Sequence, residues 1–275
     1  IYESLGVWVD FGTYLYRQWF GRAIPMSYTV CAWSGLLNTG QLAWHEGYIQ
    51  KFGLEKMLDC LPELRDYDAV QTGLAPGYAQ RWQVLKDVPF FLAMGDGAVA
   101  NVGSGAVDSQ HMALTIGTTS ALRIVKAIDH IPTGLWRYVI CEDMPLVGGA
   151  TSEGGNIYQW GVEQLGIAPQ EVNQALTNLI PDKHGLTVLP LIAGERSPGW
   201  HSDASGTIHG IRRGTSRMEL LQASLEAVAI RLSLIAQLLM DEDTQIMAGG
   251  GAIQASLAWA QMIADGFNRP VSILD

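Results

Sequence analysis

The chain has 275 residues, of which 48% are hydrophobic and 16% charged, and its formal net charge is -10. A chain of this length and composition is not disordered, and it can bury a sizeable core in one large domain or two modest ones. The acidic balance and the absence of a basic run argue against a nucleic-acid partner, and a bound anion must be held by local dipoles, hydroxyls or a metal.

The three cysteines are odd in number and widely spaced, at Cys31, Cys60 and Cys141, so they match neither a zinc pattern nor a disulfide framework. A reducing cytoplasm is therefore the expected location. The six histidines are not clustered at metal-ligand spacing, and no apolar run approaches the length that spans a membrane. Because the chain begins at Ile1 rather than Met and ends at Asp275 directly after an apolar segment, we expect a fragment.

The first predicted element is a helix over residues 8–21, because its apolar side chains recur at helical spacing and Gly21 is a typical helix stop. The tryptophans that follow are expected to pack in the core rather than to form a platform for a sugar. They are Trp33, Trp44 and Trp82.

An apolar run at residues 90–94 predicts a buried strand that ends in Gly-Asp-Gly at 95–97. A carboxylate between glycines at the end of a buried strand sits where a cleft can form and where bulky groups can approach it. Asp96 is therefore a candidate catalytic residue, although Gly-Asp-Gly is more often a simple turn.

Residues 112–125 alternate between apolar and polar side chains and are interrupted by Gly-Thr-Thr-Ser at 117–120. This pattern predicts a β-hairpin whose tight turn carries N–H groups and hydroxyls that could hold an anion. An ordinary hairpin turn is the alternative.

Residues 136–146 predict another strand, which is followed by a glycine-rich stretch at 148–156 and then by a helix. The glycine pair Gly154 and Gly155 at this helix N-terminus would expose free N–H groups that suit phosphate, and a flexible loop is the alternative. Residues 186–192 predict a buried strand that runs into Gly-Glu-Arg-Ser-Pro-Gly-Trp at 194–200. There we interpret Glu195 and Arg196 as a paired charge with a mostly structural role.

Ser216 and Glu219 form a capping-box pattern that opens a long helix with one apolar stripe. Residues 246–248 then predict a short buried strand, which runs into a glycine turn at 249–252 and a further helix. The missing side chains in this turn would let a flat ring and a ribose lie against the backbone.

Taken in order, these motifs resemble the FGGY family of carbohydrate kinases, and Gly-Glu-Arg-Ser-Pro-Gly-Trp is the most family-specific of them. The segments around Gly-Asp-Gly and Gly-Thr-Thr-Ser look closest to gluconokinase-like members. The resemblance covers about residues 14–275 and implies an α/β, RNase H-like fold of the actin, hexokinase and Hsp70 ATPase type, with a mixed sheet flanked by helices. Residues 1–105 would close the first, substrate-side domain, and residues 106–275 would form most of the second, nucleotide-side domain.

The resemblance implies ATP-dependent phosphorylation of a hydroxyl on a sugar, polyol or sugar acid of gluconate-like or xylulose-like type, with ATP and Mg²⁺ as cofactors. Asp96 matches the family's general base. The residues expected at the nucleotide are Gly117, Thr118, Thr119, Gly154, Gly155, Gly250, Gly251, Ala252 and Ser256. The expected partners are the small-molecule sugar and ATP, without nucleic acid or membrane, and a homodimer is a possible assembly.

Family members open with an Asp-x-Gly-Thr phosphate loop after a buried strand, so the copy at residues 10–13, inside a predicted helix, is not that loop. Because the loop and most sugar-binding residues of the first domain are absent, this chain alone is expected to be inactive. The alternative functions are a non-catalytic nucleotide-binding module of the actin-like fold and a sugar-binding protein without ATP. Asp96 argues against the first of these and the three glycine turns against the second. Neither Gly-x-x-x-x-Gly-Lys nor Gly-x-Gly-x-x-Gly occurs, which disfavours P-loop and dinucleotide-binding folds.

Overall fold

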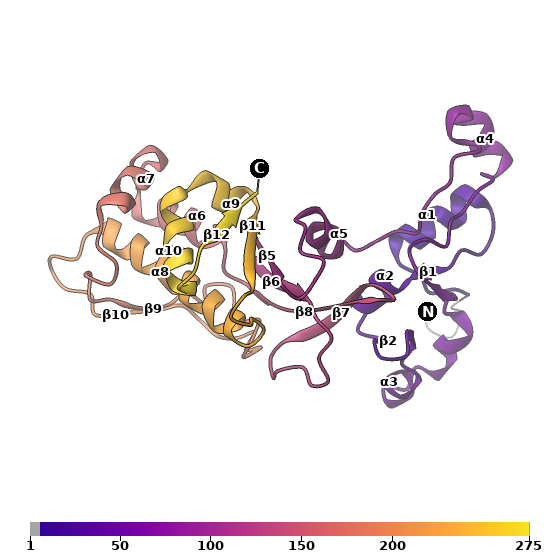
Figure 1. Cartoon of the computed structure of the whole chain (residues 1–275), viewed down its shortest axis with the longest axis horizontal. Coiled ribbons are helices and arrows are strands. Elements are labelled where there is room, and N and C mark those ends of the chain that lie inside the picture. Colours follow the sequence, from indigo (N-terminus) through magenta and orange to yellow (C-terminus); the bar gives the residue numbers. More distant parts are fainter. Residues whose placement is uncertain (1–5, 275) are drawn as a thin grey trace. The chain divides into compact units, whose positions relative to one another are not determined.

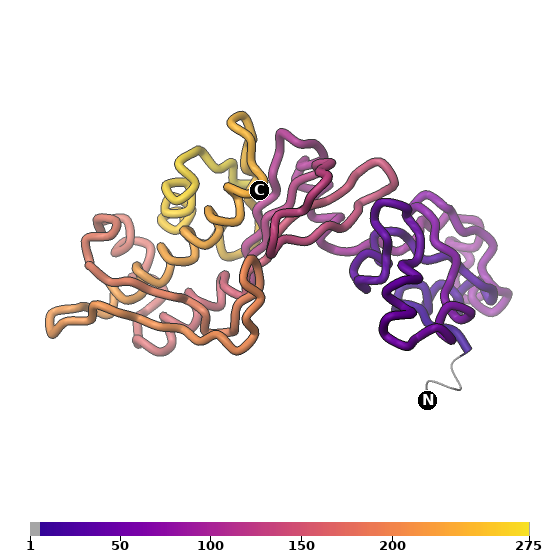
Figure 2. The backbone as a smooth tube through the Cα atoms, turned by 90° about the horizontal axis from the view of Figure 1, so that it is seen from below, coloured from indigo at the N-terminus to yellow at the C-terminus, as the bar shows by residue number. Residues whose placement is uncertain are grey.

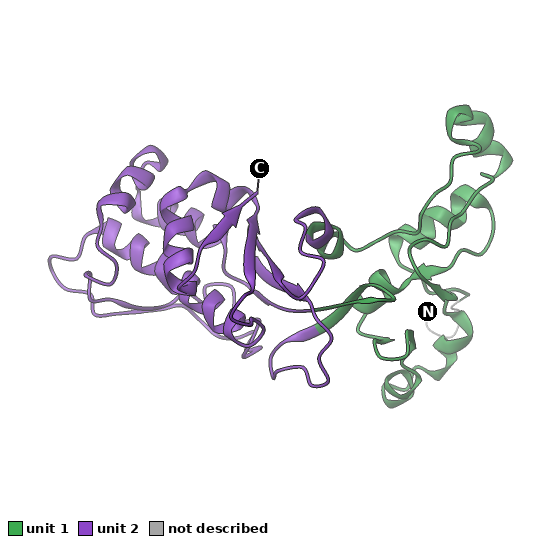
Figure 3. Ribbon diagram, viewed as in Figure 1, with its two compact units in different colours: residues 1–100, 137–146 green, residues 101–136, 147–275 purple. Residues whose placement is uncertain are grey.

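The computed structural model of the chain describes residues 6–274 (Figure 1). The contacts divide the chain into two compact units, which Figure 3 shows in different colours. The first unit contains the chain up to Ala100 together with Arg137–Leu146, and the second contains Asn101–Trp136 and the chain from Val147 onward. Among the helices described, none is long and apolar enough to cross a membrane.

The first unit consists of short elements, which pair as two small sheets and pack around two apolar clusters. Strand β1 pairs with β4 in parallel, and β2 pairs with β3 antiparallel. The elements are α1 (Phe11–Phe20), β1 (Met26–Ser27), α2 (Tyr28–Trp33), β2 (Leu37–Asn38), β3 (Ala43–Trp44), α3 (Glu46–Lys51), η2 (Glu55–Cys60), β4 (Leu64–Arg65), α4 (Pro76–Arg81), η3 (Gln83–Leu85) and α5 (Asp96–Gly103), the last of which continues into the second unit.

Helix α1 confirms the predicted helix and shows why it begins and ends where it does. The Asp10 carboxylate caps it by accepting hydrogen bonds from the N–H groups of Gly12, at 2.7 Å, and Thr13, at 3.1 Å. Gly21 ends the helix in the left-handed conformation, with φ of 64°. The Asp-x-Gly-Thr segment at residues 10–13 is therefore the start of the helix, whereas the sequence predicted it inside the helix.

The buried strand predicted at residues 90–94 is wrong. Phe90 forms an isolated antiparallel bridge with Gln71, and the N–H of Leu92 donates to the carbonyl of Tyr67, but no ladder develops. Leu92 is buried, whereas Phe91 is 53% exposed, so only one face of the segment packs. Strand formation depends on a partner of matching length, and among residues 6–274 none pairs with this segment beyond the single bridge.

A six-stranded sheet has the order β12-β11-β5-β6-β8-β7. Most of it belongs to the second unit, whereas nearly all of β7 and the start of β8 fall within residues 137–146 of the first unit. Strand β5 pairs antiparallel with β6 and parallel with β11, and β11 pairs in parallel with β12, so the sheet is mixed, as predicted. The elements are β5 (His111–Ile116), β6 (Ser120–Val125), β7 (Trp136–Cys141), β8 (Met144–Thr151), α6 (Gly155–Leu165), α7 (Pro169–Asn178), β9 (Thr187–Leu189), β10 (Thr207–His209), α8 (Arg217–Gln237), β11 (Gln245–Gly249), α9 (Gly251–Ala255), α10 (Leu257–Phe267) and β12 (Val271–Ile273).

The predicted hairpin over residues 112–125 is confirmed by β5 and β6, but the single strand predicted at 136–146 is wrong. It is two strands, β7 and β8, joined by a turn at residues 142–143. Strand β8 also continues through Gly148 to Thr151, where a loop was expected. A Cβ on Gly148 would overlap the carbonyl oxygen of Leu122 and lie 2.7 Å from the Trp136 ring, so glycine here permits the close approach of neighbouring strands.

The buried strand predicted at residues 186–192 is also wrong. Strand β9 covers only Thr187–Leu189 and pairs antiparallel with β10 in a separate two-stranded ribbon. Leu189 is 51% exposed, whereas Leu186 and Leu191 on either side of β9 are buried. The apolar residues of this segment therefore anchor its ends and do not form a central strand.

Helix α8 confirms the predicted capping box. The Ser216 hydroxyl accepts from the N–H of Glu219 at 3.2 Å, and the Ser216 N–H donates to the Glu219 carboxylate at 2.7 Å. The predicted stripe is buried in the core of the second unit, where α6 and α10 pack against α8. Figure 2 shows the backbone of α8 in orange and that of α10 in yellow. The members of the stripe are Leu221, Leu225, Val228, Leu232, Ile235 and Leu239.

Candidate functional site

Two of the predicted glycine turns meet at one edge of the six-stranded sheet. Strands β5 and β11 are parallel neighbours, with Thr115 opposite Gly249, so their carboxyl ends lie side by side. The turn at residues 117–119, which we call the phosphate turn, directly follows β5, and Gly250 directly follows β11. Ligands in α/β proteins commonly bind at the carboxyl ends of parallel strands, which makes this edge the candidate nucleotide site.

Gly250 has a backbone requirement that the sequence did not reveal. Its φ is 107°, a conformation that side chains strongly disfavour, and a Cβ on it would overlap the carbonyl oxygen of Ile116 at the end of β5. A Cβ on Gly251, in contrast, would meet nothing within 4 Å. Gly250 therefore lets β11 turn into α9 against β5, and Gly251 presents the open surface that a flat ring would need.

The start of α6 lies directly against the phosphate turn. The N–H of Gly155 donates to the carbonyl of Gly117 at 2.7 Å, and the N–H of Asn156 donates to the carbonyl of Thr118 at 3.1 Å. The N–H of Gly154 donates to the side-chain oxygen of Asn156 at 2.9 Å. The prediction that Gly154 and Gly155 present free N–H groups is therefore wrong, and a contact of these glycines with phosphate stays a prediction.

The glycine pair is nevertheless required for this packing. A Cβ on Gly154 would lie 2.7 Å from the carbonyl carbon of Thr119, and a Cβ on Gly155 would lie 2.8 Å from the carbonyl oxygen of Gly117. The Cβ on Gly155 would also lie 3.2 Å from Ala252. The phosphate turn, the start of α6 and the start of α9 thus form one close-packed backbone group.

Free donors remain on the phosphate turn itself, which is exposed to solvent. The N–H of Gly117 is occupied by the carbonyl of Thr119 at 3.0 Å. Within residues 6–274, neither the N–H groups nor the hydroxyls of Thr118 and Thr119 form a hydrogen bond. These four donors can hold an anion at a site where the net charge of the chain would repel it.

Ser256 is buried and caps α10. Its hydroxyl accepts from the N–H of Trp259 at 3.3 Å and donates to the side-chain oxygen of Asn173 on α7. The hydroxyl is thus committed to the protein, and a role of Ser256 at the nucleotide stays a prediction.

Asp96 lies in the first unit, as the first residue of α5, and its side chain is exposed. Within the described residues its carboxylate forms no hydrogen bond or ion pair. The preceding Gly95 is covered by an indole, because a Cβ there would lie 2.7 Å from ring atoms of Trp33. The carboxylate is thus free to accept a proton or a hydrogen bond.

A largely buried charge cluster that the sequence analysis missed lies at the start of α6, with the Glu153 side chain 1% exposed and those of its two partners 13–14% exposed. It consists of Glu153, Glu195 and Arg231, which we call the Glu153 cluster. Glu195 pairs with Arg231 at 2.9 Å and not with Arg196, whose side chain is exposed, so the predicted Glu195–Arg196 pair is wrong. The signal in the sequence was the lone arginine in the apolar run at residues 227–236 of α8.

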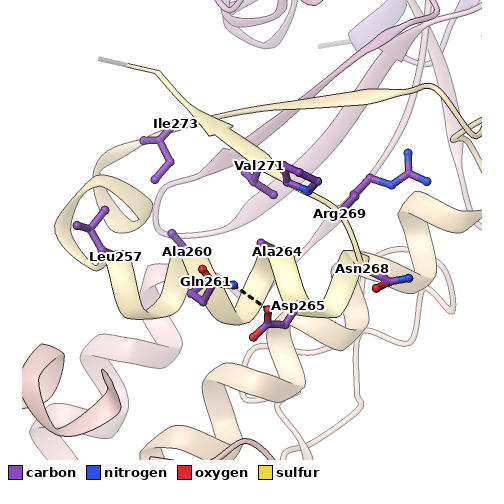
Figure 4. Close-up of a pocket in the computed structure, with 10 residues that line it drawn as sticks. Leu257, Ala260, Gln261, Ala264, Asp265, Asn268, Arg269, Val271 and Ile273 are labelled. Carbon is purple, nitrogen blue, oxygen red and sulfur yellow. Dashed lines mark hydrogen bonds between the residues drawn. The ribbon is translucent and has the colours of Figure 1, made fainter. Parts of the chain in front are cut away.

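A separate pocket lies between α10 and β12, with a volume of about 570 Å³ (Figure 4). Its walls include Leu257, Asp265 and Arg269, and it contains none of the predicted site residues. Within residues 6–274 no group of three or more His, Cys, Asp and Glu side chains could hold a metal ion.

Residues 112–275 match the model of the FGGY family of carbohydrate kinases, C-terminal domain. The gluconokinase of Bacillus licheniformis is 27% identical over 279 residues, which cover 94% of this chain and 53% of that protein. The glycerol kinase of Chloroflexus aggregans is 30% identical over 202 residues, which cover 70% of this chain and 39% of that protein. The chain therefore spans about half the length, or less, of these relatives.

Among solved structures, the ligand-bound xylulose kinase of Lactobacillus acidophilus superposes with a TM-score of 0.89 at 25% identity, covering 98% of this chain and 55% of that one. The gluconate kinase of the same organism gives a TM-score of 0.87 at 24% identity. This likeness confirms the predicted fold of the actin and hexokinase type. Because the family model matches more than half of its residues, the chain belongs to the FGGY family of carbohydrate kinases.

Proposed function

We propose that the whole protein transfers the terminal phosphoryl group of ATP to a hydroxyl of a sugar, polyol or sugar acid. The observation that carries this proposal is the close packing of three predicted glycine turns at the carboxyl ends of β5 and β11. The family membership supports a kinase, and relatives named gluconokinase and glycerol kinase support a small polyhydroxylated substrate. A gluconate-like or xylulose-like substrate is the more specific proposal, since structures of gluconate and xylulose kinases superpose well.

The phosphate turn is proposed to bind the β- and γ-phosphates through the N–H and hydroxyl groups of Thr118 and Thr119. Gly117, Gly154 and Gly155 would shape this cradle. Gly250, Gly251 and Ala252 would lie along the adenosine, and Ser256 would support that surface from its cap on α10. Mg²⁺ is proposed as the companion of ATP. Because no cluster of protein ligands for a metal exists among the described residues, the phosphates and water would supply most of its ligands.

Asp96 is proposed as the general base that takes the proton from the attacking hydroxyl. Phosphoryl transfer needs little covalent help and depends on positioning and on the stabilisation of charge. A positioned base adds to this by accepting the proton as the new bond forms. The free carboxylate of Asp96 at the start of α5 supports the assignment.

We further propose that residues 1–105 close the substrate-side domain and that residues 106–275 form most of the nucleotide-side domain. The boundary of the two units at Ala100 supports this assignment, whereas Arg137–Leu146 belongs to the first unit and departs from it. A cytoplasmic location, a homodimer and the absence of nucleic-acid and membrane partners stay predictions.

The test uses the protein at its full natural length. Release of ADP is measured with ATP and Mg²⁺ in the presence of gluconate, xylulose, glycerol and a set of related polyols and sugar acids. We expect release that depends on one of these compounds, together with a phosphate ester detected by mass. Binding of ATP without release of ADP for any compound would contradict the kinase and favour a non-catalytic nucleotide-binding module.

A further inference from the structure

The Glu153 cluster places a carboxylate in the interior beside the candidate nucleotide site. Glu153 joins β8 to α6, and its side chain is only 1% exposed. Its nearest charge is the guanidinium of Arg231, with 3.5 Å between Nε of Arg231 and Oε2 of Glu153. Neither carboxylate oxygen accepts a hydrogen bond within the described residues.

Such a group does little for the stability of the fold. A buried ion pair loses the hydration of both charges, and an apolar pair of similar volume is often as stable. Burial also raises the pKa of the Glu153 carboxyl and outweighs the opposing effect of Arg231. A charge kept in the interior at the expense of stability calls for a functional reason.

The arginine is held firmly from its other side. Nη2 of Arg231 donates to Oε1 of Glu195 at 2.9 Å and to the carbonyl of Ser197 at 3.1 Å. The hydroxyl of Ser197 accepts from the N–H of Ala150 in β8 at 3.1 Å. The guanidinium is therefore fixed to α8, to the loop at residues 194–200 and, through Ser197, to β8.

The backbone of Glu153 leads from this anchor to the phosphate turn. The carbonyl of Glu153 accepts from the hydroxyl of Thr151 at 2.7 Å. The side chain of Asn156 donates to the carbonyl of Ser152 at 2.8 Å and accepts from the N–H of Gly154. These bonds fix residues 151–156 as one unit, whose N–H groups at 155 and 156 hold the carbonyls of the phosphate turn.

We propose that Glu153 is a positioning residue for nucleotide binding. Its ion pair with Arg231 fixes the start of α6, and the start of α6 keeps the free donors of Thr118 and Thr119 in the geometry that binds phosphate. This inference rests on the proposed function of the phosphate turn.

The experiment replaces Glu153 with Gln, which keeps the shape and removes the charge, in the protein at its full natural length. The dissociation constant of ADP with Mg²⁺ is measured by calorimetry, and the KM values for ATP and for the sugar are measured separately. We expect the dissociation constant of ADP and the KM for ATP to rise by about five- to tenfold, the size expected when two interacting residues lose their contact. The KM for the sugar should change by less than about twofold.

The matched control is Glu163→Gln on the exposed face of α6, where the Glu163 carboxylate accepts a hydrogen bond from the side chain of Gln159. This variant should leave every constant unchanged. Amide exchange at Gly117, whose N–H closes the phosphate turn, and at Gly155 and Asn156, whose N–H groups join this turn to α6, should quicken in Glu153→Gln, while α7 keeps its protection. A general loss of packing would not confine the change to the phosphate turn.

Unchanged ADP affinity in a folded Glu153→Gln variant would overturn the inference and leave the proposed function intact. If that variant does not fold, Arg231→Lys replaces it, because lysine keeps the charge and loses the fork that anchors it. The same weakening of ADP binding is expected there, and wild-type affinity would overturn the inference. Failure of the wild-type protein to bind ADP would instead overturn the proposed function itself.

Discussion

The phosphate turn is held by backbone atoms of two distant segments, whereas Asp96 stands at the start of a short helix with no described partner. The turn is contacted by the start of α6 through two N–H groups, and Gly250 lies against the strand that leads into it. Asp96 follows an irregular segment and is the exposed first residue of an eight-residue helix. The comparison indicates that the proposed anion site is preformed by the main chain, while the carboxylate of the proposed base has no partner that fixes its position among the described residues.

The largest expected effect tests the carboxylate of Asp96 as the proposed general base. Asp96→Asn keeps the shape and removes the basicity, so kcat should fall by about 10²- to 10⁴-fold, the usual contribution of a positioned base. The KM for ATP should barely change, because the proposed nucleotide contacts are in the other unit. Steady-state kinetics of the full-length protein measure both constants. Asp87→Asn, at an exposed carboxylate, is the control and should behave like wild type, and a near-normal kcat in Asp96→Asn would leave Asp96 a turn residue.

The next largest effect tests whether the main chain at Gly250 holds the turn between β11 and α9. Gly250→Ala should lower the free energy of unfolding by about 1–3 kcal/mol, because its φ is nearly exclusive to glycine and the new Cβ overlaps the carbonyl of Ile116. Gly251→Ala should leave stability unchanged, since its Cβ meets open space, and should raise the KM for ATP if a ring lies there. Urea unfolding of both variants makes the measurement. Equal stability of the two variants would show that the turn is not held by the main chain.

A smaller effect tests whether Ser256 only caps α10 or also supports the proposed nucleotide site. Ser256→Ala and Ser216→Ala each remove a serine cap and should each lower the free energy of unfolding by about 0.5–2 kcal/mol. The KM for ATP should rise only in Ser256→Ala, because only that cap directly follows α9. Thermal unfolding and steady-state kinetics distinguish the two roles. An unchanged KM in both variants would make Ser256 a structural cap and nothing more.

The smallest effect is a pH dependence caused by Glu153. Because its pKa is raised in the folded protein, the folded state holds the proton more tightly than the unfolded state does. The contribution of Glu153 to the free energy of unfolding is therefore complete below the pKa of its carboxyl in the unfolded state, near 4.5. This contribution is lost as the pH rises through the pKa in the folded state. The free energy of unfolding of wild type minus that of Glu153→Gln should decline with pH over this window in a urea titration series. A flat difference would mean that burial does not oppose the charge.

The sequence by itself determined the elements whose causes are local. The Gly21 stop of α1, the hairpin around the phosphate turn and the capping box at Ser216 were all predicted correctly. Each depends on side chains within a few residues of one another, or on a periodicity along one segment. The three glycine turns were found for the same reason, since missing side chains are visible in any sequence.

Only the tertiary structure decided which segments become partners. The run at residues 90–94 has the composition of a strand but lacks a ladder, and β9 pairs in an exposed ribbon instead of the central sheet. Glu195 pairs with Arg231, 36 residues away, and not with its neighbour in sequence. The N–H groups of Gly155 and Asn156 are used by the phosphate turn, which lies nearly forty residues earlier in the chain. These outcomes depend on distant groups that compete for the same strand edge, charge or donor. A local sequence pattern does not determine which of these groups becomes the partner.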